Sequence, residues 1–215
     1  MNIGILGSAS VAQTLGSALI EHGHSVMLGT RDPAKLDGWK SKAGKKASVG
    51  SFAQAAAFGQ MVFNCTNGQN SLAALKSVDS KALDAKVIVD VANPLDFSRG
   101  MPPSLTVCNT DSLAEQIQRA YPKAKVVKAL NTVTASLMVN PGLLKGGEHT
   151  LFICGNDPTA KAEVIGVLKK DFGWKDVMDV GDLSAARGTE MLLALWVRLF
   201  GALGTPMFNF KVVRS

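Results

Sequence analysis

The chain has 215 residues, of which 47% are hydrophobic, so it can bury a substantial core and a disordered protein is excluded. The formal net charge of +6 favours anionic partners, but Lys and Arg are spread along the chain and base-stacking aromatic residues do not accompany the densest basic segment, so nucleic acid is not an expected partner. No run of 18 or more apolar residues is present, and we expect no membrane partner.

Two further features predict a cytoplasmic protein. Strand-like sequence begins at Asn2, without the basic and apolar segments of an export signal. Cys65, Cys108 and Cys154 lie far apart, and none has the C-x-x-C spacing of a zinc or redox site. We expect reduced, mostly buried thiols.

Short apolar runs rich in Val, Ile and Leu alternate with longer segments of helical period, which is the pattern of βαβ units. Residues 87–91 are nearly continuous in apolar character, as expected for a strand covered on both faces. The sequence therefore predicts an α/β fold, with a Rossmann-type doubly wound, mainly parallel sheet. Eight strands are predicted, at Asn2–Leu6, Ser25–Gly29, Lys46–Val49, Met61–Cys65, Lys86–Val91, Lys125–Leu130, Thr150–Cys154 and Lys175–Val180.

The C-terminal part has a different character. We predict a Rossmann domain at residues 1–181 and a small helical extension at residues 182–215. Asp182 or Ser184 can cap a helix that continues to about Leu203 and is apolar over more than one face. This helix either packs on the Rossmann domain or forms a contact in a homodimer, and Pro206–Phe210 should lie across the same surface.

The N-terminal segment has the order of a dinucleotide site, which needs a strand, a tight glycine turn and a helix whose first amides receive the pyrophosphate. Gly7 falls at the turn, but Ala9 occupies the place of the second glycine in the fingerprint. Its methyl group should push the phosphate slightly outward, and the hydroxyl groups of Ser8 and Ser10 can compensate. Taken alone, the segment also fits an ordinary βα turn.

The end of the second predicted strand indicates which dinucleotide is bound. NAD-binding proteins place Asp or Glu there to bond the ribose 2′-hydroxyl. Here the strand is followed by Thr30 and Arg31, and a guanidinium can bind a 2′-phosphate, whereas a carboxylate would repel it. Lys35 stands one turn further on, and Asp32 before Pro33 is typical of a helix N-cap. We therefore predict NADP(H), the alternative being that Arg31 is a solvated surface charge.

The carboxyl ends of the later strands should face the nicotinamide half of the ligand. The loops at residues 65–70, 92–95 and 130–133 are rich in uncharged hydrogen-bonding groups. We expect Asn93 and Asn131 near the ring and the second substrate. The alternatives are a turn asparagine for Asn93 and a helix cap for Asn131 or Thr132.

No acid, base or metal ligand is assigned. Tyr121 and Lys125 have the Tyr-x-x-x-Lys spacing of short-chain dehydrogenases, but Pro122 breaks the helix that this chemistry needs. The three histidines lack metal-ligand spacing. Direct hydride transfer between two organic rings needs positioning and no protein acid or base, so this absence is compatible with such a reaction.

Four segments, at residues 3–8, 29–33, 90–95 and 128–132, together resemble the deazaflavin (coenzyme F420)-dependent NADP oxidoreductase family. The resemblance implies a Rossmann domain that binds NADP, a C-terminal part that completes the deazaflavin pocket and contributes to dimers, and hydride transfer between the two rings. It assigns three groups of residues: Thr30, Arg31 and Lys35 to the 2′-phosphate; Ser8, Ala9, Ser10 and Val11 to the pyrophosphate loop; and Thr66 and Asn67 to the nicotinamide ribose. Asn93, Pro94, Asn131 and Thr132 would border the second substrate.

Asn131 stands where the best-matched deazaflavin reductases have histidine, so the resemblance leaves the acceptor open. The leading hypothesis is an NADPH-dependent oxidoreductase acting on a deazaflavin, a flavin or a related planar acceptor. One alternative is a reductase of the β-hydroxyacid or pyrroline-carboxylate type, which usually carries a large all-helical domain that the residues after Gly181 leave little room for. The other is a non-catalytic NADP(H) sensor or interaction protein.

Overall fold

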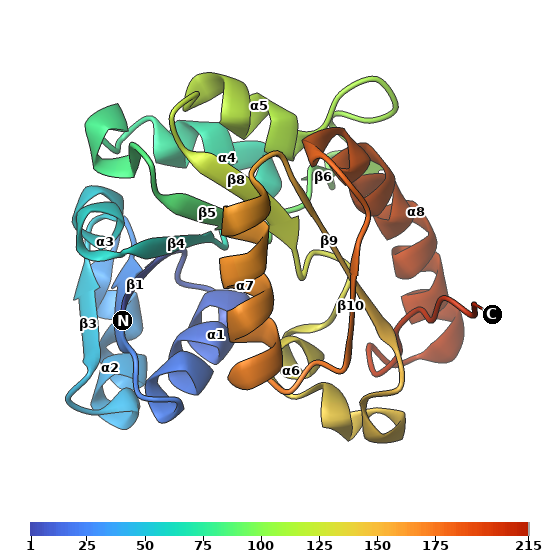
Figure 1. Ribbon diagram of the computed structural model, residues 1–215, viewed down its shortest axis with the longest axis horizontal. Helices are drawn as coiled ribbons and strands as arrows, with labels where there is room; N and C mark the ends of the chain where they lie inside the picture. The colour runs from blue at the N-terminus through green and yellow to red at the C-terminus, as the bar shows by residue number, and fades with distance from the viewer. Residues whose placement is uncertain (215) are drawn as a thin grey trace.

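The computed structural model describes residues 1–214, and its centre is an eight-stranded sheet in the order β10-β9-β8-β5-β4-β1-β2-β3 (Figure 1). Neighbouring strands are parallel except β8 and β9, so the predicted doubly wound, mainly parallel sheet is confirmed. All eight predicted strands are present, with ends that differ by a residue or so. They are β1 (Asn2–Leu6), β2 (Ser25–Gly29), β3 (Ala47–Gly50), β4 (Met61–Asn64), β5 (Val87–Asp90), β8 (Lys125–Ala129), β9 (Thr150–Gly155) and β10 (Asp176–Asp179).

A second, two-stranded antiparallel sheet was not predicted. It consists of β6 (Leu95–Asp96) and β7 (Ser104–Leu105). Strands of two residues are too short to show an alternating pattern in the sequence. The pair follows directly on the loop after β5, one of the loops expected at the ligand.

Helices cover both faces of the large sheet, as βαβ crossovers require. The α-helices are α1 (Ser10–Glu21), α2 (Asp37–Ala43), α3 (Phe52–Phe58), α4 (Gly68–Leu75), α5 (Leu113–Ala120), α6 (Ala135–Val139), α7 (Pro158–Lys170) and α8 (Ala186–Leu203). Short 3-10 helices lie at Pro33–Leu36, Ser80–Leu83, Pro141–Leu143, Lys145–Gly147 and Leu183–Ala185. In the described part of the chain, no helix has both the length and the apolar character to cross a bilayer.

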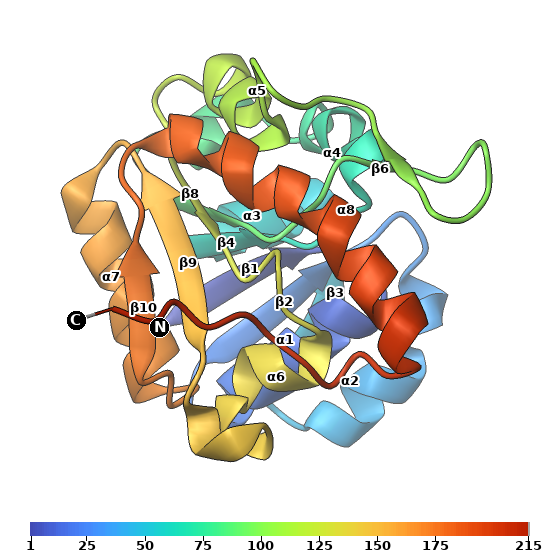
Figure 2. The same cartoon turned by 90° about the vertical axis from the view of Figure 1, so that its right-hand side faces the viewer.

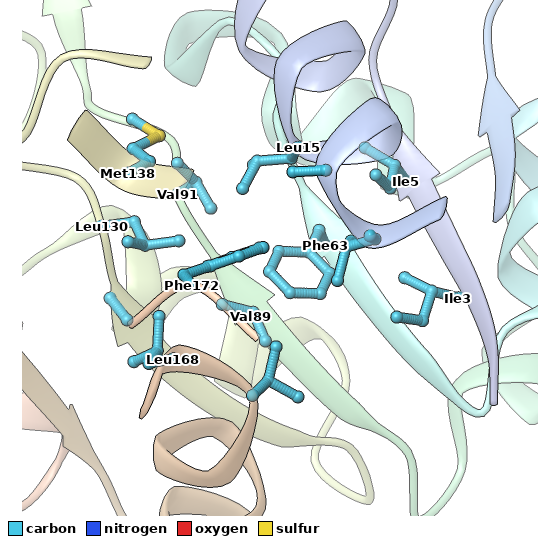
Figure 3. Close-up of a cluster of buried hydrophobic side chains, with 14 of the residues drawn as sticks. Ile3, Ile5, Leu15, Phe63, Val89, Val91, Leu130, Met138, Leu168 and Phe172 are labelled. Atoms are coloured by element: carbon cyan, nitrogen blue, oxygen red, sulfur yellow. The ribbon is translucent and has the colours of Figure 1, made fainter. Parts of the chain in front are cut away.

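Two hydrophobic cores lie on opposite faces of the sheet, because successive strand residues point to opposite sides. Ile3 and Ile5 of β1 face one core, which α1, α2, α6 and α7 close (Figure 3). Leu6 faces the other core, to which α3, α4, α5 and the start of α8 contribute. The sheet is thus covered on both sides.

The C-terminal helix is confirmed, and it crosses the face of the molecule that Figure 2 presents. Asp182 accepts a hydrogen bond from the Ser184 amide and caps the 3-10 turn that leads into α8. The tail after α8 returns across the molecule: the Phe208 ring lies 5.1 Å from that of Trp196, and the Thr150 amide donates to the Phe210 carbonyl at 2.9 Å. The division of the chain at residue 181 stays a prediction.

Gly4, in the middle of β1, sets the distance between the sheet and α3. A Cβ atom at this position would lie 2.1 Å from the Ala55 carbonyl oxygen and 2.9 Å from its carbon. Both are backbone atoms of α3, so the contact cannot be relieved by a side-chain rotation. Only glycine permits this close packing of helix on strand.

Substitution Gly4→Ala should lower the free energy of unfolding by about 3 kcal/mol or more, because overpacking against backbone forces the helix off the strand. Gly166→Ala is the matched control, since Gly166 lies in α7 with open space around its Cα. It should raise the free energy of unfolding by about 0.5–1 kcal/mol through helix propensity. Urea denaturation of both variants measures these changes, and an unchanged midpoint for Gly4→Ala would contradict the packing argument.

Candidate functional site

The predicted glycine turn connects β1 to α1. Gly7 has φ +145, and a Cβ there would lie 2.7 Å from the Cys65 carbonyl oxygen, so both conformation and space require glycine. Ala9 is the N-cap of α1, and its side chain makes no capping hydrogen bond. The first amides of α1 therefore have no side-chain partner and face the end of the sheet where an anion is favoured.

A cavity of about 340 Å³ lies beside this turn. Thr30, Arg31 and Lys35 line one side of it, and Gly7, Ser8 and Ala9 line another. The structure thus brings most of the residues that the sequence assigned to the phosphates together in one cavity, whereas Ser10 and Val11 line a neighbouring cavity. Cavity A, as we call this space, is lined by Gly7, Ser8, Ala9, Thr30, Arg31, Asp32, Lys35, Phe52, Cys65, Thr66, Asn67, Asn70, Ala73, Ala74 and Ser77.

The charged groups of cavity A are open to solvent. Arg31 is exposed, and within residues 1–214 it forms no ion pair. Lys35 lies 3.6 Å from Asp32, an exposed pair of the kind that contributes little to stability. Asp32 does occupy the predicted N-cap position, but its side chain makes no capping bond, and the Thr30 hydroxyl accepts from its amide instead. Both cations remain available to an anionic ligand.

A second cavity of about 380 Å³ adjoins the first along the carboxyl ends of β4, β5 and β8. Cys65, Thr66 and Asn67 line both, so one loop forms the wall that they share. Cavity B is lined by Ser10, Val11, Cys65, Thr66, Asn67, Gly68, Val91, Ala92, Asn93, Leu95, Phe97, Asn131, Val133, Thr134, Ala135, Met138, Leu193 and Trp196. No side chain in this set carries a charge, so the cavity suits an uncharged ring.

Asn93 and Asn131 meet at the wall of cavity B. The side-chain Nδ2 of Asn93 donates to the backbone carbonyl of Asn131 at 2.7 Å. In return, the side-chain Nδ2 of Asn131 donates to Oδ1 of Asn93 at 3.0 Å. Asn131 also donates to the backbone carbonyl of Thr189 on α8 at 3.0 Å. Pro94 and Thr132, which were expected at the second substrate, are buried and line neither cavity.

The sequence did not indicate which residues of α8 line cavity B. Leu193 and Trp196 come from α8, and the Trp196 ring stacks on that of Phe200 at 5.8 Å. The apolar stripe of this helix was visible in the sequence, but its register toward a cavity depends on how the helix is anchored. Phe97, from the unpredicted β6–β7 hairpin, lines the cavity as well.

The anchor is a buried ionic cluster that sequence reasoning missed. The Lys128 ammonium lies 2.8 Å from Asp90 and 2.9 Å from Glu190, and all three side chains are at most 1% exposed. Lys128 also donates to the Ala92 carbonyl. A signal was present, because Asp90 and Lys128 are charged residues directly beside the apolar runs of β5 and β8. We call this the Lys128 cluster.

Glu190 connects this cluster to a helix end. Its carboxylate accepts from the amides of Leu113 at 2.9 Å and Ala114 at 3.2 Å, at the start of α5. Burial raises the pKa of Glu190, and the Lys128 ammonium opposes that effect. Burial alone would lower the pKa of Lys128, but the Asp90 and Glu190 carboxylates outweigh it and raise the pKa, so the ammonium stays charged.

Asp90 also reaches the wall between the cavities. Its carboxylate accepts from Asn64 at 2.8 Å, and the Asn64 side chain accepts from the Thr66 hydroxyl at 2.7 Å. Burial, and secondly the Asp90 charge, raises the pKa of the Cys65 thiol, so this cysteine is not a nucleophile at neutral pH. The expectation of mostly buried thiols is wrong for Cys108, which is exposed.

The structure also shows where the Tyr-x-x-x-Lys pair lies and whether metal ligands converge. Tyr121 ends α5 and Lys125 begins β8, where Lys125 pairs with Asp157 at 3.1 Å, so the two do not share a helix. Within residues 1–214, no three His, Cys, Asp or Glu side chains converge as potential metal ligands.

Comparison with known proteins places the chain in a family. A family model described as NADP oxidoreductase, coenzyme F420-dependent, matches residues 2–94. A candidate F420-dependent NADP reductase from Arthrobacter sp. FB24, known from its crystal structure, is 51% identical, with a TM-score of 0.96 and coverage of 100% of both chains. The chain belongs to this family. The family is one of NADP-dependent oxidoreductases, as the resemblance implied.

Other proteins are similar to this chain in sequence over part of their own length, or in fold alone. Metalloreductase STEAP3 of Rattus norvegicus is 28% identical over 191 residues, 88% of this chain and 36% of the relative. Metalloreductase STEAP2 of Homo sapiens is 26% identical over 225 residues, 100% of this chain and 42% of the relative, so the chain spans about two fifths of such proteins. A reductive aminase from Aspergillus terreus in complex with NADPH has 16% identity and a TM-score of 0.67, over 94% of this chain and 62% of that one, which shows a common fold.

Substitution Lys128→Met should lower the free energy of unfolding by about 3–5 kcal/mol, because it leaves two buried carboxylates without their counter-charge. The control is Lys123→Met, whose partner Asp84 lies 3.2 Å away but whose side chain is 75% exposed, so its loss should cost less than about 1 kcal/mol. Thermal and urea unfolding measure both changes. Equal destabilisation by the two substitutions would show that the Lys128 cluster is no stronger than a surface pair.

Proposed function

We propose that the protein is an NADPH-dependent oxidoreductase that transfers hydride between NADP(H) and a planar acceptor such as a deazaflavin or a flavin. The observation that carries this proposal is the pair of adjoining cavities, one beside a glycine turn with two exposed cations and the other uncharged and partly aromatic. Family membership supports the nucleotide, and the acceptor is inferred from the chemistry of cavity B.

The residues fit a phosphorylated dinucleotide. We assign the 2′-phosphate to Arg31, Lys35 and Thr30, because they supply two cations and a hydroxyl at the outer end of cavity A. The pyrophosphate is assigned to the turn, where Gly7 has the positive φ of a tight turn and the first amides of α1 have no side-chain partner. This second group is Gly7, Ser8, Ala9, Ser10 and Val11.

Thr66 and Asn67 are assigned to the nicotinamide ribose, because they line both cavities. Asn93 and Asn131 are assigned to the border with the second substrate. Pro94 and Thr132 would act only from behind this wall, as supports for the two asparagines. NADPH supplies the hydride when bound, and the protein positions the two rings and excludes water between them.

A homodimer is part of the proposal. Several apolar side chains of α8 face solvent: Met191 is 37% exposed, Leu195 51%, Phe200 39% and Leu203 55%. Such a row on one helix is typical of a protein contact surface.

Sedimentation equilibrium should give twice the 22.6 kDa chain mass for the unmodified protein and a shift toward monomer for Leu195→Glu. A monomer for both proteins would contradict the dimer.

A cytoplasmic location stays a prediction from the sequence.

The nucleotide assignment predicts a preference of NADPH over NADH that depends on Arg31. Arg31→Ala should weaken NADPH binding by about tenfold to a hundredfold, since a charged hydrogen bond contributes about 1.5–3 kcal/mol, and should leave NADH binding nearly unchanged. Fluorescence titration with both nucleotides measures this. Arg119→Ala, whose guanidinium pairs with Asp111 away from both cavities, is the control and should keep the preference.

Turnover decides between an enzyme and a sensor. We expect the protein to oxidise NADPH in an acceptor screen that contains a deazaflavin, flavins and quinones. Tight NADPH binding with no turnover on any acceptor would favour the non-catalytic alternative. Binding of NADH as tightly as NADPH by the unmodified protein would contradict the nucleotide assignment itself.

A further inference from the structure

The Lys128 cluster carries an excess of negative charge in a place that water does not reach. Asp90 and Glu190 each contribute a carboxylate, and Lys128 contributes one ammonium, all at most 1% exposed. Three donors converge on Glu190, from Lys128 and from the amides of Leu113 and Ala114. An ionised carboxylate only accepts hydrogen bonds, so this set of donors fits the charged form, and the cluster has a net charge of −1.

This charge lies directly behind the wall of cavity B. Ala92 lines the cavity, its amide donates to Asp90 at 3.3 Å, and its carbonyl accepts from Lys128. On the other side, Glu190 follows Thr189, whose carbonyl accepts from Asn131 of the same wall. Asp90 also accepts from Asn64, which bonds the hydroxyl of Thr66 in the wall between the two cavities.

No charged side chain lines the cavity side to offset the charge. None of the side chains that line cavity B is ionisable except Cys65, whose thiol is neutral. The α5 amides offset part of the charge of Glu190, and Lys128 pairs with both carboxylates, so Asp90 and Glu190 share the remaining negative charge. Buried charges are also less screened by salt than surface charges.

We propose that the Lys128 cluster makes the site bind oxidised nicotinamide more tightly, relative to reduced nicotinamide, than a neutral wall would, and so favours NADPH as the hydride donor. This inference rests on the proposed function, because it needs the nicotinamide half in cavity B. When hydride leaves, the ring loses two electrons and one proton and gains one positive charge, and the planar acceptor takes up the hydride. A negative charge behind the wall stabilises the cationic product of that step.

The expected size follows from Coulomb's law. At an effective dielectric constant of about 20 and a separation on the order of 10 Å, one unit charge changes the relative affinity of two ligands that differ by one charge by about tenfold. Because the α5 amides offset part of the field, we expect about three- to tenfold for removal of one carboxylate. Asp90 and Glu190 do not touch the reacting atoms. Their role is to place negative charge behind the wall of cavity B.

The test is the ratio of the dissociation constants of NADPH and NADP⁺, measured by equilibrium titration without turnover. Glu190→Gln and Asp90→Asn bring the net charge to zero and should each lower this ratio by about three- to tenfold. The double substitution Lys128→Met with Glu190→Gln keeps a net charge of −1 and should restore the ratio of the unmodified protein. A purely structural role would leave the double variant no closer to that ratio than the single one.

Glu115→Gln is the control. Glu115 bonds Arg187 of α8 at 2.6 Å, so its loss weakens the same α5–α8 contact, but Glu115 lies outside the wall of cavity B and the ratio should not change. A ratio that is equal in all folded variants overturns the inference and leaves the proposed function intact, whereas absence of nucleotide binding contradicts the proposed function. If the single variants do not fold, the triple substitution of Asp90→Asn with Lys128→Met and Glu190→Gln decides, because it leaves no unpaired buried charge. Its cluster has a net charge of zero, so the ratio should again fall by about three- to tenfold, and an unchanged ratio overturns the inference.

Discussion

The Lys128 ammonium joins parts of the protein that are far apart in the sequence. It binds Asp90 at the end of β5 and Glu190 on α8, and Glu190 in turn holds the first amides of α5. Burying these charges is favourable only when all partners are in place, because each one alone would lose its hydration without compensation. The central strands, α5 and α8 therefore form a single cooperative unit, and the wall of cavity B that α8 supplies has a fixed position.

The loop at residues 65–67 has a comparable role for the ligand. It lines both cavities, and its backbone carbonyl at Cys65 lies where a Cβ of Gly7 would be. The loops after β1 and β4 are thus in direct contact. Gly68 continues this arrangement, since a Cβ there would lie 1.9 Å from the Asn93 carbonyl oxygen after β5. Three strand ends are packed backbone to backbone, which gives a rigid floor on which two rings can be held face to face.

The fold could be predicted because its pattern is local: continuous apolar strands, helical periods between them and a glycine turn at Gly7. The same holds for Arg31 and Thr66, which follow recognisable strands and therefore reach the same sheet edge. The Lys128 cluster could not be assembled from the sequence, because pairing Lys128 with Glu190 requires the path of α8, which no local pattern specifies. The sequence also could not show that Asn93 and Asn131 line the cavity while Pro94 and Thr132 do not, because adjacent loop residues point to different sides and only the backbone conformation decides which side faces the cavity.

The anchoring of α8 near one end has an evolutionary consequence. Glu190 lies in the first two turns of the helix, and Trp196 follows six residues later, about 9 Å further along the axis. The second half of α8 contributes to cavity B but not to the ionic cluster. Sequence change there can reshape cavity B while the Lys128 cluster and cavity A stay intact. Changes in the shape of cavity B can therefore accumulate with little loss of stability, because the residues that shape the cavity and the residue that anchors the helix lie in separate stretches of α8.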